Sequence, residues 1–153
     1  MSLFEQQWQA YRTVLDPDSM EHKAVADATA AAFWIWCDQR RDRHASVALV
    51  DLGCGDLAHL APLYRSLPLS SYIGLDLTAF VLPLAESQMG QAGFPCRWIL
   101  GDLLDWAQKK ADESVDLIHS AFAIHHLSDP DKVRFLKGAR RRIADDGLLV
   151  WAD

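Results

Sequence analysis

Apolar positions along the chain follow two alternating spacings. Short runs rich in β-branched residues, closed by glycine or polar residues, indicate buried strands at residues 46–52, 71–77, 96–100, 115–122 and 148–151. Between these runs apolar residues recur every three or four positions, which indicates helices at 20–43, 56–67, 78–90, 103–111 and 128–144. Such alternation of strand and helix predicts a parallel sheet that helices cover on both faces.

Polar residues and glycine suggest where two of these helices begin and end. Asp18 and Glu21 have the spacing of a capping box at the start of the first helix. Ser128 stands at the N-cap position of the last helix, with Pro130 in its first turn. Gly147 is predicted to close that helix as its C′ glycine.

The composition of the chain mainly excludes certain kinds of partner. The chain has 153 residues, of which 50% are hydrophobic and 24% charged, as expected for a globular domain. Its net charge of −6 argues against a nucleic-acid partner, which requires a basic face. No apolar run is long enough to cross a bilayer and the first residues do not resemble a secretory leader, so we expect no membrane partner. Three cysteines, an odd number, suggest reduced thiols and a cytoplasmic location.

Acidic residues and glycines follow three successive predicted strands, at the sheet edge where α/β proteins bind ligands. They are Asp51, Gly53, Gly55 and Asp56 after the first strand, Asp76 after the second and Asp102 after the third. The glycine pair alone fits a nucleotide-binding turn or a plain βα turn about equally well. Asp76 lies 21 residues beyond Gly55, close to the spacing at which an acid reaches a ribose hydroxyl. Acids at three strand ends together are hard to explain as helix caps alone.

The charge of the first turn narrows the choice of nucleotide. A dinucleotide places its pyrophosphate at the start of the first helix, and Asp51 and Asp56 would repel it there. These carboxylates suit a ligand with one ribose and a positive charge. S-adenosyl-L-methionine has this set of groups.

Five segments carry a resemblance to a known family. VALVDLGCGDL, SYIGLDLT, ILGDLLDW, VDLIHSAFAIHHL and GLLVWAD occur in this order over about residues 47–153. Together they resemble the class I S-adenosylmethionine-dependent methyltransferase family. The resemblance implies a Rossmann-like, three-layer α/β sandwich with a mainly parallel sheet of five strands in the order 3-2-1-4-5. It also implies a cofactor-binding domain at residues 46–153, preceded by a helical segment at 1–45 that packs on or over the cofactor site.

The resemblance further assigns a role to single residues. Asp51 and the backbone of Gly53, Cys54 and Gly55 would hold the methionine part of S-adenosyl-L-methionine. Asp76 would bind both ribose hydroxyls, and Leu77 would pack on the adenine. Asp102 would accept a hydrogen bond from the adenine amino group, with Leu103 beside it. Ser120 would offer a backbone contact to the methionine amine.

Histidines are the candidates for proton transfer. His125 follows the fourth strand and is predicted to act as a general base, which methyl transfer needs only when the acceptor arrives protonated. An equal alternative is that His125 and His126 line a polar loop. His119 lies inside the fourth strand and is predicted to be a hydrogen-bonded core or face residue. No metal site is expected, because these histidines lack ligand spacing and have no cysteine pair beside them.

The chain departs from the family pattern after its fifth strand. Family members usually add two more strands, so we expect a sheet lacking the last two and a chain truncated at the fifth strand. Residues 148–151 would then form an apolar edge strand uncovered on one side, which another copy or a partner chain would protect.

The expected function is methyl transfer to a small-molecule acceptor, because neither a basic face nor an added recognition domain is present. Two alternatives stay open. One is a non-catalytic module that binds S-adenosyl-L-methionine and works with a partner chain. The other is a nicotinamide-dependent dehydrogenase, because Gly53, Gly55 and Ala58 partly fit the dinucleotide fingerprint.

Overall fold

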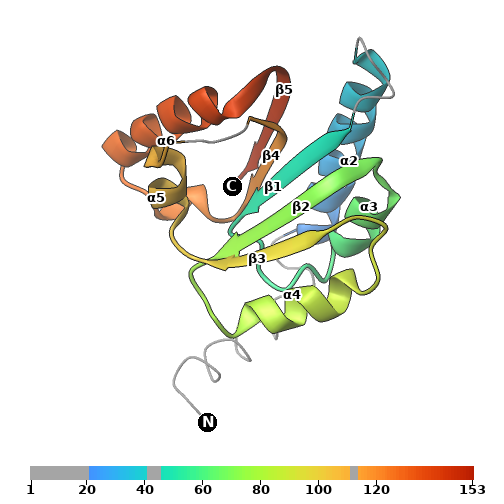
Figure 1. Cartoon of the computed structure of the whole chain (residues 1–153). Helices are drawn as coiled ribbons and strands as arrows, with labels where there is room; N and C mark the ends of the chain where they lie inside the picture. Colours follow the sequence, from blue (N-terminus) through green and yellow to red (C-terminus); the bar gives the residue numbers. More distant parts are fainter. Residues whose placement is uncertain (1–20, 41–45, 111–113) are drawn as a thin grey trace.

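A single parallel sheet organises the chain (Figure 1). The computed structural model describes residues 21–40, 46–110 and 114–153. Its strands lie in the order β3-β2-β1-β4-β5, and each pairing between neighbours is parallel, as predicted. They are β1 (Val47–Leu52), β2 (Leu69–Asp76), β3 (Cys96–Leu100), β4 (Val115–Ala121) and β5 (Ile143–Ala152).

Helices pack on both faces of the sheet and complete three layers (Figure 1). On one face lie α2 (His22–Gln39), α3 (Ala61–Ser66) and α4 (Val81–Met89), and on the other α5 (Leu103–Gln108) and α6 (Asp129–Arg142). A 3₁₀ turn, η1 (Ile124–His126), connects β4 to α6. None of the helices in the described ranges combines the length and apolar character required to span a bilayer. The Rossmann-like three-layer prediction is confirmed.

The alternating directions of side chains along β1 and β4 build two separate cores. Leu49 of β1 and Leu117 of β4 face the cluster under α2, α3 and α4. Val50 and Ile118, one position further along, face the cluster under α5 and α6. On the α2 side, the row of apolar side chains along β1 and along β4 is followed by a polar residue. Polar side chains therefore lie at the carboxyl ends of these two strands.

Two predicted helix starts were inaccurate. Residues 56–60 do not form the first turns of a helix, since Leu57 adopts a positive φ of 60° and α3 begins only at Ala61. The residue before α2 is Glu21, in a left-handed conformation with no side-chain cap. Asp18, the other half of the predicted capping box, lies outside the described residues. Ser128 does cap α6, because its hydroxyl accepts from the backbone N–H of Asp131.

Gly147 does not close α6 as predicted. The helix ends at Arg142 and the chain passes directly into β5, which contains Gly147. A Cβ at this position would lie 2.8 Å from the Asp116 carbonyl oxygen of β4. Gly147 therefore permits close packing of β5 on β4, and it was mistaken for a helix signal.

β5 is covered on its faces, and its outer edge pairs with no strand in the described part of the chain. Leu148 and Val150 pack with the α2-side cluster, and Leu149 with the α6-side cluster. The indole N–H of Trp36 in α2 also donates to the Asp146 carbonyl oxygen at 2.7 Å. Leu148, Leu149 and Val150, for which an uncovered side was predicted, thus pack against the two clusters, while the hydrogen-bonding edge of β5 pairs with no described strand.

Gly138 offers a test of the packing between α5 and α6. A Cβ on Gly138 would lie 2.8 Å from the Ala107 carbonyl carbon and closer still to its oxygen. We expect Gly138→Ala to lower the free energy of unfolding by about 1–3 kcal/mol, because overpacking against backbone outweighs the better helix propensity of alanine. The measurement is urea unfolding followed by tryptophan fluorescence. Gly93→Ala is the control, since within the described part of the chain only its sequence neighbours come within 4 Å of its Cβ position. Equal unfolding midpoints for the two variants would contradict the prediction.

Candidate functional site

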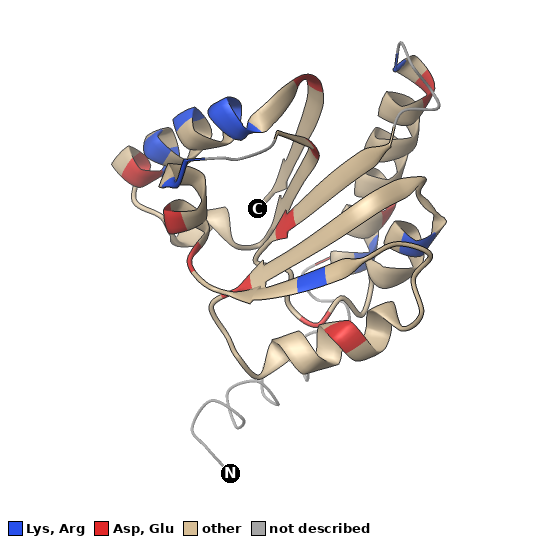
Figure 2. Cartoon of the chain, in the orientation of Figure 1, with Lys and Arg blue, Asp and Glu red and all other residues tan. Residues whose placement is uncertain are grey.

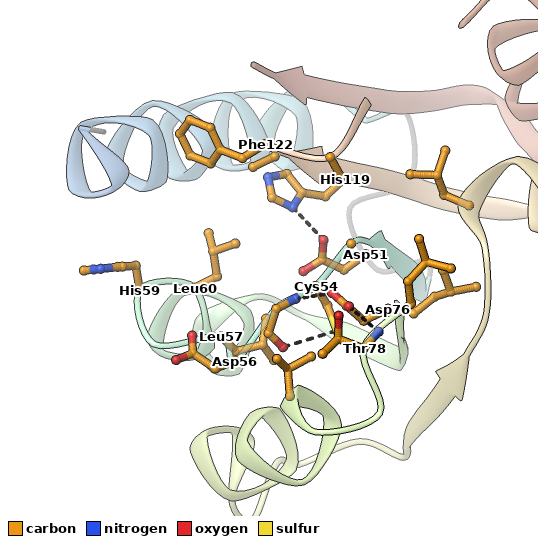
Figure 3. A pocket seen from close by; sticks show the side chains of 18 of the residues that line it. Asp51, Cys54, Asp56, Leu57, His59, Leu60, Asp76, Thr78, His119 and Phe122 are labelled. Carbon is orange, nitrogen blue, oxygen red and sulfur yellow. Dashed lines mark hydrogen bonds and ion pairs between the residues drawn. The ribbon is translucent and has the colours of Figure 1, made fainter. Parts of the chain in front are cut away.

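A cavity of about 510 Å³ opens at the carboxyl ends of the strands (Figure 3). Its walls come from the start of α2, the 53–60 turn, the ends of β2 and β3, and the segment from the end of β4 through η1. This volume falls within the range of small-molecule sites in proteins. It also lies where an open parallel sheet is expected to bind ligands.

Eight of the ten residues predicted for the site line this one cavity. They are Asp51, Gly53, Cys54, Gly55, Asp76, Leu77, Asp102 and Leu103. Ser120 and His125 are not on its wall. The structure thus brings together acids and glycines that lie far apart in the sequence.

The glycine turn after β1 is held by backbone and packing constraints. Gly53 has a φ of 76°, and a Cβ on it would lie 2.6 Å from the Cβ of Ala123. Gly55 has a φ of 58°, and apart from its chain neighbours no atom of the described residues lies within 4 Å of its Cβ position. Both N–H groups of Gly53 and Cys54 donate to the Leu75 carbonyl oxygen, at 2.8 and 3.0 Å. The turn is therefore fixed to β2, and at Gly55 it leaves open space beside the backbone.

The Asp76 carboxylate connects this turn to the end of β2. Its Oδ2 accepts from the Gly55 N–H at 2.9 Å, and its Oδ1 accepts from the Thr78 N–H at 2.8 Å. These two backbone donors hold the carboxylate in one orientation (Figure 3). Because each carboxylate oxygen has two acceptor sites, both can still accept from a ligand.

Asp102 is both a helix cap and a cavity residue. Its Oδ1 accepts from the N–H groups of Leu104 and Asp105, at 2.7 and 3.0 Å, at the start of α5. The capping bonds use one oxygen, which leaves Oδ2 for a ligand. Leu103 is buried beside it, whereas Leu77 is 67% exposed at the rim. This side of the cavity therefore combines an acceptor oxygen with apolar surface.

Asp51 is fully buried and already surrounded by donors. The Tyr64 hydroxyl donates to its Oδ2 at 2.8 Å, and the Tyr72 hydroxyl lies 3.4 Å from the same oxygen. His119 Nδ1 lies 2.9 Å from its Oδ1 (Figure 3). Burial, and after it the Asp51 charge, raises the pKa of both tyrosines well above the ordinary value, so each keeps its proton. Asp51 thus lies in the cavity wall with its oxygens engaged by protein groups.

His119 is buried and hydrogen-bonded, as predicted, and it also lines the cavity. Its partner follows from the strand register, since Asp51 of β1 lies directly opposite His119 of β4. The available signal was that both residues end apolar columns on the same face of the predicted sheet.

Ser120 and His125 lie off the cavity wall for simple geometric reasons. Ser120 follows His119 along a strand, so its side chain points to the opposite face and donates to the Leu52 carbonyl oxygen at 2.8 Å. In η1, successive side chains point in different directions, and it is His126 that lines the cavity. His125 Nδ1 instead lies 3.3 Å from an Asp153 carboxylate oxygen.

The aromatic wall on the β4 side was not predicted. Phe122 has a positive φ of 55°, and its N–H donates to the Ala152 carbonyl oxygen at the end of β5. Its ring contacts the ring of His22, at the start of α2, with centroids 4.4 Å apart. This contact joins residues 100 positions apart in the chain, and no local pattern indicates it.

Cys54 is a structural residue of the turn. Burial, and after it the Asp51 charge, raises the pKa of the Cys54 thiol above its ordinary value. A protonated thiol is a poor nucleophile and a poor metal ligand. What Cys54 offers a ligand is therefore its backbone.

A match to a protein family agrees with this geometry. Residues 49–147 match the sequence model of a family described as a methyltransferase domain. The chain therefore belongs to this methyltransferase family. No curated protein matches the chain in sequence.

Solved structures share the fold at low sequence identity. An S-adenosylmethionine-dependent methyltransferase from Clostridium acetobutylicum ATCC 824 superposes with a TM-score of 0.68 and 17% identity, over 96% of this chain and 56% of its own. The plantazolicin methyltransferase BpumL, in complex with a triazolic desmethylPZN analog and SAH, gives a TM-score of 0.69 and 15% identity, over 92% and 51%. A SAM-dependent methyltransferase from Thiobacillus denitrificans, in complex with S-adenosyl-L-homocysteine, gives 0.60 and 20%, over 84% and 47%. The chain spans about half the length of these proteins.

The donors around Asp51 can be ranked by substitution. Tyr64→Phe removes a 2.8 Å hydrogen bond to a buried carboxylate, whereas Tyr72→Phe removes a longer one of 3.4 Å. We expect Tyr64→Phe to lower the free energy of unfolding by about 1.5–3 kcal/mol and Tyr72→Phe by about half as much or less. Chemical unfolding of the two variants measures the difference. An equal loss in both variants would contradict this ranking, and no loss in Tyr64→Phe would show that its hydroxyl does not stabilise the Asp51 charge.

Proposed function

We propose that this chain binds S-adenosyl-L-methionine and transfers its methyl group to a small-molecule acceptor. The observation that carries the proposal is the convergence of Asp51, Asp76 and Asp102 on one cavity behind an open glycine turn. When bound, S-adenosyl-L-methionine supplies a methyl carbon activated by positively charged sulfur.

The described lining residues fit the nucleoside part of this cofactor. Asp76, held by two backbone donors, has the acceptor sites to bind both ribose hydroxyls by charge-assisted hydrogen bonds. Asp102 Oδ2 would accept from the adenine amino group, while Leu77 and Leu103 pack against the ring. The absent side chain at Gly55 lets the ligand approach the turn.

The charge of the cavity favours a cation. Four of the described lining residues are acidic, namely Asp51, Asp56, Asp76 and Asp102, and none is lysine or arginine. Figure 2 shows lysine and arginine along α6, with others on β3 and on the α2 and α3 side, and none of them belongs to the described cavity lining. A pyrophosphate would find no positive side chain among these lining residues, which weighs against a nicotinamide dinucleotide.

Methyl transfer requires alignment of donor and acceptor and exclusion of water more than it requires acid–base chemistry. The rings of Phe122 and His22 form an aromatic wall that supports such exclusion. For an acceptor that arrives protonated, a base must come from near this wall. His125 stays a prediction for that role. His126 lies closer, on the wall itself, and its ring centroid is 4.1 Å from that of His125.

A small-molecule acceptor is supported by the size of the cavity and by the structural likeness to a plantazolicin methyltransferase. The absence of turnover with any acceptor would favour the non-catalytic binding module. A cytoplasmic location also stays a prediction. So does a further chain, or a second copy, on the open edge of β5.

Isothermal titration calorimetry with S-adenosyl-L-homocysteine tests the ribose assignment. We expect Asp76→Asn to weaken binding about 10- to 100-fold, because a charged acceptor is replaced by an amide that presents one donor group. Asp56→Asn makes the same change at another lining residue with no assigned contact and should alter affinity less than about threefold. Thermal shifts with NAD should be absent. Tight binding by Asp76→Asn, or a large NAD shift in the unmodified protein, would contradict the proposal.

A further inference from the structure

One nitrogen of His119 has no hydrogen-bond partner in the described structure. His119 is 1% exposed, and its Nδ1 lies 2.9 Å from both Asp51 Oδ1 and the Tyr64 hydroxyl. Its Nε2 is buried and bonds to no described group. A buried polar atom without a partner destabilises the fold, so its position calls for an explanation.

The bonds at Nδ1 determine what Nε2 can do. A carboxylate only accepts hydrogen bonds, and the Tyr64 hydroxyl gives its proton to Asp51 Oδ2. The proton between His119 and Asp51 therefore belongs to Nδ1. In the neutral ring this leaves Nε2 as an acceptor with an unused lone pair.

The geometry of the ring directs that lone pair away from Asp51. The two ring nitrogens are separated by one carbon and point outward in different directions, and His119 belongs to the cavity wall. Figure 3 shows one nitrogen joined to Asp51 and the other turned away from it, on the side of Phe122 and Leu60. Asp51 and His119 are both buried, and both belong to the cavity wall. The Asp51 oxygens are engaged by protein groups, whereas His119 Nε2 is bonded to no described group.

The order of the strands identifies the part of the ligand that lies nearby. Along the sheet edge, Asp102 follows β3, Asp76 follows β2, and Asp51 and His119 lie at β1 and β4. With adenine at Asp102 and ribose at Asp76, the amino-acid part of the cofactor extends toward β1 and β4. Its protonated amino group is a hydrogen-bond donor with a positive charge.

We propose that His119 Nε2 accepts a hydrogen bond from this amino group, and that Asp51 acts on the cofactor through His119 without touching it. Asp51 fixes the tautomer and orients the ring, and its negative charge strengthens the acceptor. This inference rests on the proposed function and replaces direct contact by Asp51 with contact by a histidine. His119 is thus a binding residue and Asp51 a positioning residue.

Two ligands separate this role from a structural one. S-adenosyl-L-homocysteine has the amino-acid group, whereas 5′-methylthioadenosine has the same nucleoside and sulfur without it. His119→Asn keeps a donor near the Nδ1 position for Asp51 and removes the Nε2 acceptor. In calorimetry we expect this variant to lose about tenfold or more in affinity for S-adenosyl-L-homocysteine and less than about twofold for 5′-methylthioadenosine.

His59→Asn is the matched control, because it makes the same change at an exposed residue of the cavity wall. It should leave the ratio of the two affinities unchanged. Nitrogen-15 NMR of the unmodified, histidine-labelled protein provides a readout that does not depend on a variant folding. The His119 Nε2 resonance should shift on addition of S-adenosyl-L-homocysteine and stay in place with 5′-methylthioadenosine.

The outcomes are distinguishable. An equal loss for both ligands in His119→Asn, or an Nε2 resonance unmoved by bound S-adenosyl-L-homocysteine, would overturn the proposal and leave the cofactor assignment intact. Failure of the unmodified protein to bind either ligand would overturn the proposed function, and this inference with it.

Discussion

The buried carboxylate of Asp51 is the constraint on which the site depends. A carboxylate shielded from water is tolerated only where donors surround it. Those donors come from three elements, because Tyr64 belongs to α3, Tyr72 to β2 and His119 to β4. Satisfying one charge therefore fixes β1 relative to both neighbouring strands and to the helix above them. Asp51 and His119 of this network also line the cavity, so the network makes this part of the cavity wall rigid.

Asp76 performs a complementary task at the rim of the same sheet. It organises backbone instead of side chains, since its two oxygens accept from the N–H groups of Gly55 and Thr78. The turn after β1 and the turn after β2 are thereby held at a constant separation. Asp51 thus stabilises the floor of the cavity, and Asp76 shapes its opening while keeping acceptor sites for a ligand.

The strands and the main acids were predictable because both depend on local information. Short apolar runs indicate strands, and an acid directly after a strand must lie at the sheet edge. The helix start was missed because Leu57 continues the helical spacing of apolar residues and is buried in the core cluster under α2, although its backbone is left-handed. Gly147 was misread since its reason is contact with β4. The His22–Phe122 wall depends on tertiary placement alone, which no local pattern encodes.

The distribution of charge has a consequence for how ligands arrive. Basic side chains follow one flank of the molecule along α6, while the mouth of the cavity is acidic (Figure 2). Such a separation of charge would give the molecule an electric dipole, whose field would attract cations toward the acidic end. The positively charged cofactor would then associate faster than the product, because the product has lost the positive charge on sulfur together with the methyl group. Added salt screens the field, so this difference in association rate would decrease as the ionic strength rises.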